Sequence, residues 1–318
     1  MSASSTLFSV LVQCHGEDRY LARAIESLWA QSFEDFEIIA VDDGTADGAD
    51  NPLDTLVARS PRPMRVMGAL DRDAPVALNA AAAMATSRYL AFLDDADAYR
   101  PDRLDAVSRV VRKADRFAWG FSGVEPIDES GTPLATADLP DPGIRSAIQR
   151  SRAPLDAVRG LPYENTMVAN GNLVVEAGLF RDLGGFRNLR FTYAWDLALR
   201  LLDLGAPFVV ERPLYQHRIH APATDDRHAA DERRRLVARE SLVVISEHQE
   251  RMAVRPRFTP LIAAAAGRER DLDADDAWAV TVTLWALAKL RRIPPAYAAV
   301  RNAARVVRSS RRLWSRRR

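Results

Sequence analysis

The sequence predicts an α/β fold in which a doubly wound, mostly parallel sheet is flanked by helices. Short apolar runs, typical of buried parallel strands, occupy residues 8–12, 36–41, 64–67 and 89–93. Helical patterns follow them, at residues 19–30, 53–60, 76–86 and 103–114. Because strand and helix patterns alternate, we expect the strands to join one sheet through βαβ connections.

Two of these predicted strands end in clusters of aspartate. The first cluster contains Asp42, Asp43 and Asp47, and the second contains Asp94, Asp95 and Asp97. The carboxyl ends of strands in an open α/β sheet are where ligands bind. Crowded carboxylates repel one another unless a divalent cation or hydrogen-bond donors compensate them. The sequence therefore predicts a metal and a ligand rich in hydroxyl or N–H groups at this edge.

The second half of the chain has a different pattern. Proline and glycine interrupt residues 125–162, and the stretch 132–143 is predicted to be an exposed loop. Amphipathic helical patterns follow at residues 227–252 and 273–290. We therefore expect one domain over residues 1–225, with halves 1–115 and 116–225, and a helical C-terminal extension with a basic tail over residues 226–318.

Charge is distributed unevenly along the chain. Eight of the 44 basic residues are arginines in residues 295–318, which contain no acidic residue, so the rest has 36 basic and 43 acidic residues. The near-neutral total argues against nucleic-acid binding. The arginine-rich tail fits either a basic amphipathic helix on anionic lipid or a solvated end.

Cysteine use and hydropathy bear on the compartment. A single cysteine, Cys14, leaves no intramolecular disulfide and fits a reducing environment. The N-terminus lacks the pattern of a signal peptide, and the apolar stretch 277–288 is shorter than the roughly 18 residues that span a bilayer. We expect a cytoplasmic protein whose tail could touch the inner face of the cell membrane.

A series of segments keeps a characteristic order along roughly the first 225 residues. They are residues 8–12, 21–33, 36–39, 42–47, 74–79, 88–97 with Pro101, 170–186, 195–202 and 215–220. This series resembles the family 2 glycosyltransferases, which have the GT-A fold. The resemblance implies inverting, metal-dependent transfer of a sugar from a nucleoside diphosphate to a glycan, glycolipid or lipid-linked acceptor, in the assembly of cell-surface material.

The resemblance also implies roles for individual residues. Donor-binding residues would be Gln13, His15, Asp43, Asn79 and Asp94, and acceptor-binding residues would be Asn170 and Asn172. Mn²⁺ or Mg²⁺ would be held by Asp95, Asp97 and His220. The alternative for Asp42 and Asp43 is a turn that caps the backbone, and an Asn-Gly turn is the alternative for residues 170–172.

The acidic loop departs from the family pattern. Relatives usually place carboxylates seven, five and four residues before a proline, whereas here they stand seven, six and four before Pro101, with Ala96 in the middle position. Asp94 is therefore the expected ribose or metal-loop contact, and either Asp95 or Asp97 the direct metal ligand. In the stretch that ends at His220, strand alternation would place Arg218 and His220 on one face and His217 on the other.

The expected catalytic base is missing. The family commonly has Glu-Asp-x-Asp-Leu at the start of a helix, with the second residue as base, whereas the aligned stretch here is Tyr193-Ala194-Trp195-Asp196-Leu197. Ala194 cannot accept a proton. Asp196 is the remaining catalytic candidate, although it could equally form an i,i+4 ion pair with Arg200.

The absence of a base at residue 194 can be understood in three ways. The alignment could be shifted by two residues, or a carboxylate elsewhere, such as Asp182 or Glu164, could serve. The protein could also be a non-catalytic binder of sugar nucleotides or a scaffold. Gly184 and Gly185 are interpreted as structural, because glycine readily adopts a positive φ.

Overall fold

The computed structural model of the protein describes residues 6–14, 18–42, 52–68, 73–113, 119–220 and 227–251. Its strands are β1 (Phe8–Cys14), β2 (Phe36–Asp42), β3 (Met64–Gly68), β4 (Tyr89–Asp94), β5 (Ala98–Tyr99), β6 (Trp119–Ile127), β7 (Val174–Glu176) and β8 (Phe208–Arg218). Its α-helices are α1 (Asp18–Trp29), α2 (Pro52–Arg59), α3 (Ala74–Met84), α4 (Arg103–Val111), α5 (Pro142–Ser151), α6 (Pro154–Gly160), α7 (Ala177–Asp182), α8 (Tyr193–Leu202) and α9 (Arg227–Arg251). Two short 3₁₀ turns are η1 (Thr136–Asp138) and η2 (Asn170–Asn172).

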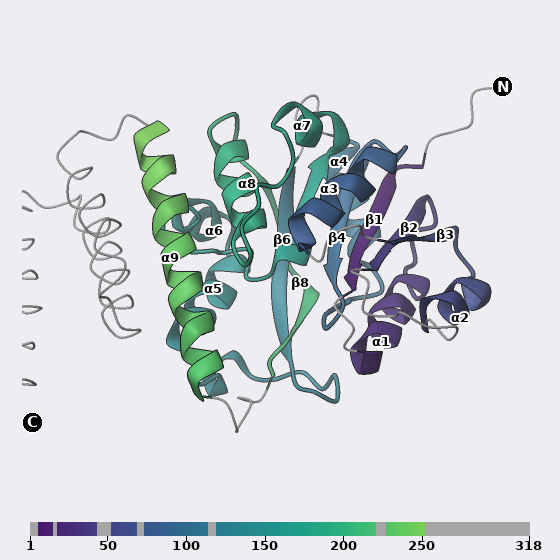
Figure 1. Ribbon diagram of the computed structural model, residues 1–318, viewed down its shortest axis with the longest axis horizontal. Coiled ribbons are helices and arrows are strands. Elements are labelled where there is room, and N and C mark those ends of the chain that lie inside the picture. The colour runs from purple at the N-terminus through teal and green to yellow at the C-terminus, as the bar shows by residue number, and fades with distance from the viewer. Residues whose placement is uncertain are drawn as a thin grey trace, which may run out of the picture.

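The strands form one sheet in the order β3-β2-β1-β4-β7-β6-β8-β5 (Figure 1). The first four strands along this order are parallel, as the alternating pattern predicted. Beyond them β7 runs antiparallel to β4 and β6, and β5 runs antiparallel to β8. The α/β fold is confirmed, and the predicted ends of the strands and helices of the first half agree with the structure within three residues.

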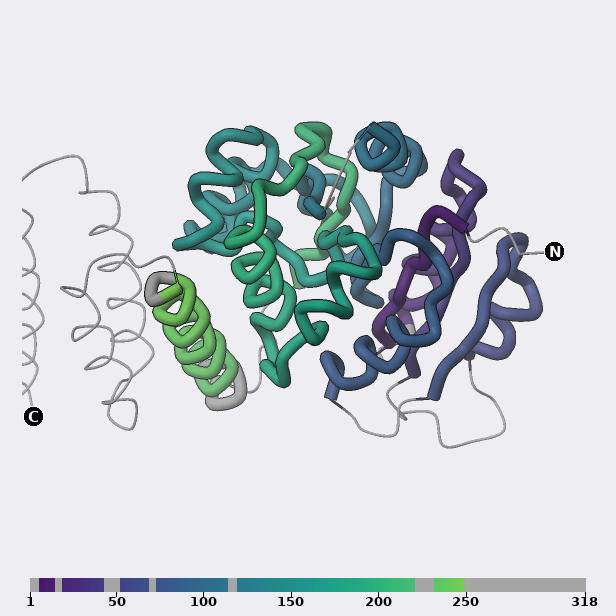
Figure 2. The backbone as a smooth tube through the Cα atoms, turned by 90° about the horizontal axis from the view of Figure 1, so that it is seen from above, coloured from purple at the N-terminus to yellow at the C-terminus, as the bar shows by residue number. Residues whose placement is uncertain are grey.

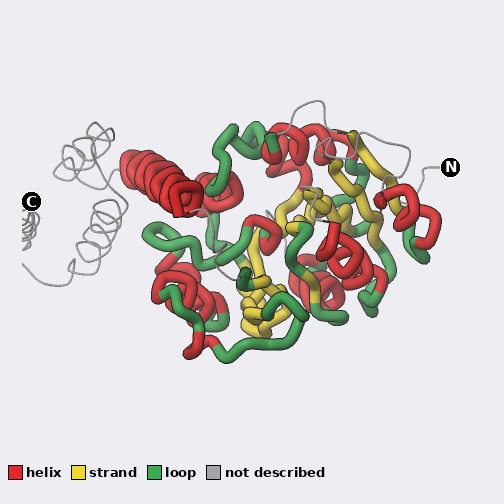
Figure 3. The backbone as a smooth tube through the Cα atoms, turned by 60° about the horizontal axis from the view of Figure 1, so that its bottom comes forward, coloured by secondary structure: helices red, strands yellow, loops and turns green. Residues whose placement is uncertain are grey.

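Helices cover both faces of the sheet because its central strands are apolar on both faces. In β1, Leu11 packs in one core with residues of α3, α7, α8 and α9, whereas Val10 and Val12 pack in a second core with residues of α1, α2 and α4. Strands buried on both faces have continuous apolar sequences, which is why β1, β2 and β4 could be recognised, whereas β3 at the edge of the sheet is only partly buried. Figure 3 shows the strands in the interior with the helices around them.

Residues 132–143 form a largely exposed connection, as predicted. The connection is not wholly irregular, because Pro133 pairs with Ile127 in a single β-bridge and η1 follows. At its end Asp141 caps α5, since its Oδ1 accepts hydrogen bonds from the backbone N of Gly143 at 2.7 Å and of Ile144 at 3.2 Å.

A fully buried arginine joins the elements around the second half of the sheet. Arg103, at the start of α4, donates from Nη1 to the Ser122 hydroxyl on β6 and from Nη2 to the carbonyl of Asn172 at 3.0 Å. Its guanidinium carbon lies 4.4 Å from the ring centroid of Tyr99 and 5.2 Å from that of Tyr215. The cation is thus held between two aromatic rings and two acceptors.

Helix α9 lies beyond the boundary predicted at residue 225, yet it packs on the body of the molecule beside α8 (Figure 2). Val244 and Ile245 of α9 are buried in the same core as α8. This helix confirms the helical pattern predicted up to residue 252. The predicted helix at 273–290 and the basic tail lie outside the described residues, and the domain boundary stays a prediction. Among the described helices, none has the length and hydropathy needed to cross a bilayer.

Candidate functional site

The candidate site lies at the carboxyl ends of β1, β2 and β4. In the register of these parallel strands Gln13 stands beside Asp94, and Cys14 stands beside Asp42. The Gln13 side chain is buried, and its Oε1 accepts a hydrogen bond from the Tyr193 hydroxyl at 2.7 Å. The other two donor-binding predictions at this edge, His15 and Asp43, lie outside the described residues.

The acidic loop after β4 is crowded with negative charge. Burial and, next, the nearby Asp97 carboxylate raise the pKa of Asp94 to about 7, although the Gly171 N–H donates to its Oδ2 at 3.2 Å. Asp95 is 8% exposed. Burial and the negative neighbours around Asp94 therefore outweigh the groups that would stabilise its charge.

Asp97 is fixed by strand β8. Its Oδ2 accepts from the Tyr215 hydroxyl at 2.7 Å, its Oδ1 accepts from the Arg218 backbone N at 2.8 Å, and His217 Nδ1 lies 3.1 Å from Oδ2. Burial alone would lower the pKa of His217, but the Asp97 carboxylate outweighs it and leaves that pKa raised. Asp97 thus holds the loop to β8 through several protein groups.

The two histidines at the end of β8 face different neighbours, as strand alternation predicted. The His220 ring lies 5.7 Å from the Tyr20 ring, over which Arg218 also places its guanidinium carbon at 4.4 Å. His217 instead reaches Asp97. His217, and not His220, is therefore the histidine beside Asp97 of the acidic loop, and the sequence analysis did not predict this contact. The strand alternation that places His217 on the face opposite to His220 could have indicated it.

The loop carboxylates offer part of a ligand set for a divalent cation. In the described ranges no group of three or more His, Cys, Asp or Glu side chains is arranged to hold a metal. Asp94 and Asp95 nevertheless offer hard oxygen ligands in a negatively charged loop, and Mg²⁺ is commonly held by one or two carboxylates together with substrate phosphates. The donor set fits such a shared site.

The predicted polar residues around the site have structural partners. Asn79 exchanges two hydrogen bonds of 2.8 Å with the backbone of Phe186, and Gly184 and Gly185 before it have φ of 76° and 68°, as predicted for structural glycines. Asn170 donates to the Phe191 carbonyl at 3.2 Å and remains partly exposed.

The structure argues against the prediction that Asn172 contacts the acceptor. It is fully buried, and its amide donates to the carbonyls of Ser122 at 2.8 Å and of Met167 at 2.9 Å. Its Oδ1 accepts from the Ser122 backbone N at 3.2 Å. An acceptor sugar cannot reach a side chain in that position, so Asn172 holds β6 and η2 together instead.

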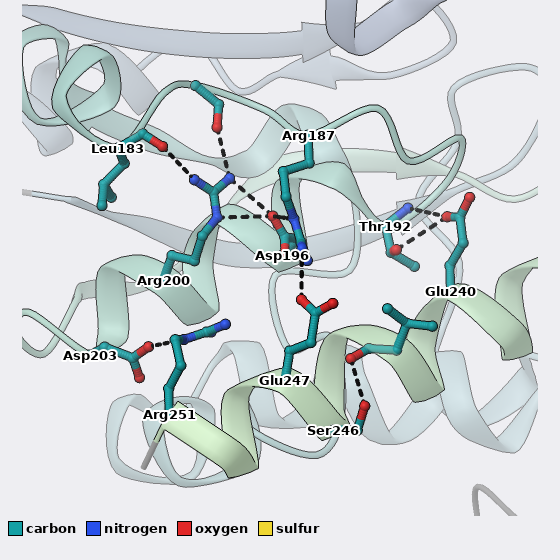
Figure 4. A network of polar contacts seen from close by, with 12 residues as sticks. Leu183, Arg187, Thr192, Asp196, Arg200, Asp203, Glu240, Ser246, Glu247 and Arg251 are labelled. Carbon is teal, nitrogen blue, oxygen red and sulfur yellow. Dashed lines mark hydrogen bonds and ion pairs between the residues drawn. The ribbon is translucent and has the colours of Figure 1, made fainter. Parts of the chain in front are cut away.

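Asp196 also has a structural environment. It is 1% exposed, and its Oδ2 accepts from the Nε atoms of Arg187 at 3.0 Å and Arg200 at 2.9 Å, while Oδ1 accepts from Arg187 (Figure 4). The i,i+4 ion pair with Arg200 is therefore confirmed. Because both oxygens are buried and occupied, the structure argues against Asp196 as the catalytic base.

The remaining base candidates gain no support from their surroundings. Ala194, at the family's base position, is fully buried. Glu164 pairs with Arg150 at 3.0 Å, and Asp182 is an exposed residue at the end of α7. Their catalytic assignment stays a prediction.

Gly171 of η2 lies close to the acidic loop. A Cβ there would lie 2.6 Å from the backbone N of Asp94 and would also press on the Tyr215 hydroxyl. We expect Gly171→Ala to lower the free energy of unfolding by about 1–3 kcal/mol, because the backbone must move. Urea denaturation measures this. Gly178→Ala is the control, since a Cβ at Gly178 meets nothing within 4 Å, and an equal loss in both variants would contradict the close approach.

Solved structures share this architecture. The S. aureus TarS 1-349 complex with UDP-GlcNAc aligns with a TM-score of 0.55 at 15% identity, over 96% of this chain and 92% of that one. The mannosyltransferase PcManGT from Pyrobaculum calidifontis, in complex with GDP-Man and Mn²⁺, aligns with a TM-score of 0.55 at 17% identity, over 98% and 83%. The sheet and its acidic edge therefore define a protein of the GT-A fold class.

Sequence comparison then gives a family match. Residues 9–156 match the model of the family "Glycosyl transferase family 2". An uncharacterized glycosyltransferase of Nostoc sp. is 34% identical over 107 residues, which are 34% of this chain and 33% of the relative. The succinoglycan biosynthesis protein ExoO of Rhizobium meliloti is 40% identical over 97 residues, 30% of this chain and 26% of the relative. These alignments span a third or less of the two relatives.

Proposed function

We propose that this protein is a metal-dependent, inverting glycosyltransferase that takes a sugar from a nucleoside diphosphate donor and adds it to a glycan or lipid-linked acceptor in cell-surface glycan assembly. The observation that carries the proposal is the crowded acidic loop, with Asp94 and Asp95 at the carboxyl end of β4 in a GT-A sheet. The succinoglycan role named for one relative supports a polysaccharide product.

Each group of residues has a proposed task. Asp94 and Asp95 would hold Mn²⁺ or Mg²⁺ together with the donor phosphates, and the cation would stabilise the charge of the departing nucleoside diphosphate. Asp97 would keep the loop in place through β8. Gln13, His15 and Asp43 remain the proposed nucleoside contacts. His220 remains proposed for the metal or the diphosphate, and Asn170 for the acceptor.

A second function is favoured by one observation. Ala194 is buried at the base position, and the nearest aspartate of the same helix, Asp196, is held by two arginines. A protein that binds the sugar nucleotide without transferring the sugar would need no base. The two functions share the donor site and differ in the release of nucleoside diphosphate when an acceptor is present.

Thermal unfolding of the full chain with UDP, GDP or dTDP, each with and without Mn²⁺, tests the donor site. A nucleotide at about 100 times its Kd stabilises the native state by about 2.7 kcal/mol, so we expect one nucleotide to raise Tm by roughly 5 °C, and only with Mn²⁺. Asp95→Asn should remove this shift. A shift of equal size without Mn²⁺, or no shift with any nucleotide, would contradict the proposed site.

We also infer a cytoplasmic protein whose arginine-rich residues 295–318 contact anionic lipid at the membrane surface. Support comes from composition alone, since this stretch has eight arginines and no acidic residue. Such contact would suit a transferase with a lipid-linked acceptor.

A further inference from the structure

The entry into helix α8 is held by a residue from a distant helix. Thr192 is the N-cap of α8, but its side chain makes no capping hydrogen bond within the helix. The Thr192 hydroxyl instead donates to Oε2 of Glu240 on α9, at 3.1 Å. The segment before α8 therefore depends on α9 for its partners.

Glu240 accepts from three successive backbone N–H groups as well. Its Oε1 accepts from Arg190 N at 2.7 Å, and its Oε2 accepts from Phe191 N at 2.9 Å and Thr192 N at 3.0 Å. Hydrogen bonds with an ionised partner are stronger than neutral ones, and a negative charge is favourable at a helix N-terminus. One carboxylate thus fixes residues 190–192 in space, as Figure 4 shows for Thr192.

The first residue after this segment reaches the donor site. Tyr193 is buried, and its ring lies 4.9 Å from that of Phe186. Its hydroxyl donates to Gln13 Oε1 at 2.7 Å, at the carboxyl end of β1. Gln13 stands beside Asp94 in the sheet. Glu240 and the acidic loop are therefore joined by a short series of direct contacts.

We propose that Glu240 is a positioning residue of the donor site: by anchoring residues 190–192 it sets the place of Tyr193 and, through it, of Gln13 beside Asp94. This inference rests on the proposed function in that Gln13 borders the nucleotide. Glu240 itself is not a catalytic residue, because its oxygens are occupied by four donors.

The same helix supplies a matched control. Glu247 lies two turns after Glu240 and pairs with Arg187 at 2.6 Å, and Arg251 pairs with Asp203 at the end of α8. Both contacts fasten α9 to the body without touching residues 190–192. A loss of Glu247 should therefore loosen α9 but leave the entry into α8 anchored.

The experiment compares Glu240→Gln, Glu240→Ala and Glu247→Gln in the full chain. Hydrogen exchange by mass spectrometry follows the peptide that covers residues 187–197, and calorimetry gives the Kd of UDP and of GDP, each with Mn²⁺. We expect both Glu240 variants to exchange faster in this peptide and to weaken nucleotide binding about tenfold. Glu247→Gln should change nucleotide binding by less than about twofold.

Two results would overturn the inference. One is unchanged exchange of this peptide in Glu240→Gln. The other is faster exchange with nucleotide affinity equal to that of Glu247→Gln, because the carboxylate would then serve stability alone. If the proposed function is wrong, the wild-type chain will bind neither nucleotide. In that case the hydrogen-exchange comparison alone tests whether Glu240 anchors residues 190–192.

Discussion

Asp94→Asn should stabilise the metal-free protein at pH 8 while it abolishes Mn²⁺-dependent nucleotide binding. In the folded chain burial and the Asp97 carboxylate raise the pKa of Asp94 to about 7, whereas an unfolded chain ionises this group near pH 4. Between these values the folded state binds more protons, so the wild-type protein loses stability as pH rises from about 4 to about 7. Asparagine carries no charge and avoids this loss.

The gain should be on the order of 2 kcal/mol at pH 8, less than the full pKa shift would give, because the side chain keeps some contact with water. It should vanish near pH 4, because the carboxyl group is then protonated in the folded chain and carries little charge in the unfolded one. Urea denaturation of both proteins at the two pH values, without metal, measures it. Asp128→Asn is the control: hydrogen bonds from the Ser130 hydroxyl and nearby backbone lower the pKa of Asp128, so its loss should bring no gain. An Asp94→Asn variant that is less stable than wild type at pH 8 would refute the crowding of the loop.

Arg103→Ala should lower the free energy of unfolding by about 3–5 kcal/mol, because it removes charge-assisted hydrogen bonds and leaves a cavity between two tyrosines. The Ser122 hydroxyl and the Asn172 carbonyl lose a buried donor. Urea denaturation with circular dichroism measures the change.

Arg109→Ala, in the same helix, serves as the control. Arg109 forms an exposed i,i+4 pair with Asp105 at 2.7 Å, and such pairs contribute about 0.3–0.5 kcal/mol. Comparable losses in the two arginine variants would contradict the proposed role of the buried cation.

The first half of the fold could be predicted because β1, β2 and β4 are buried on both faces and its strands alternate with helices. The short strands β5 and β7 could not be predicted, because they have two and three residues, too few for a periodic pattern. Their places in the sheet depend on long-range pairing, such as that of Tyr99 with Tyr215.

The acidic residues of the site could be located from the sequence, but their separate roles could not. Asp97 is fixed by Tyr215 and Arg218, which are 118 and 121 residues away in the chain. Asp196 is paired with Arg187 from the loop before α8, and Asn172 of η2 is paired with Ser122 of β6. Sequence spacing identifies a partner one helical turn away, such as Arg200 for Asp196, but not the partners that are distant in the chain.

The anchoring of residues 190–192 by Glu240 has a consequence for synthesis of the chain. Glu240 follows Thr192 by 48 residues, which a ribosome adds in roughly 2–10 s. Once Arg218 has been added, the complete sheet and its acidic loop have been translated, but the carboxylate that holds the entry into α8 has not. If Glu240 has the proposed positioning role, a nascent chain acquires the proposed donor site only after α9 emerges, and a chain released before α9 has the acidic loop but not the anchored entry into α8.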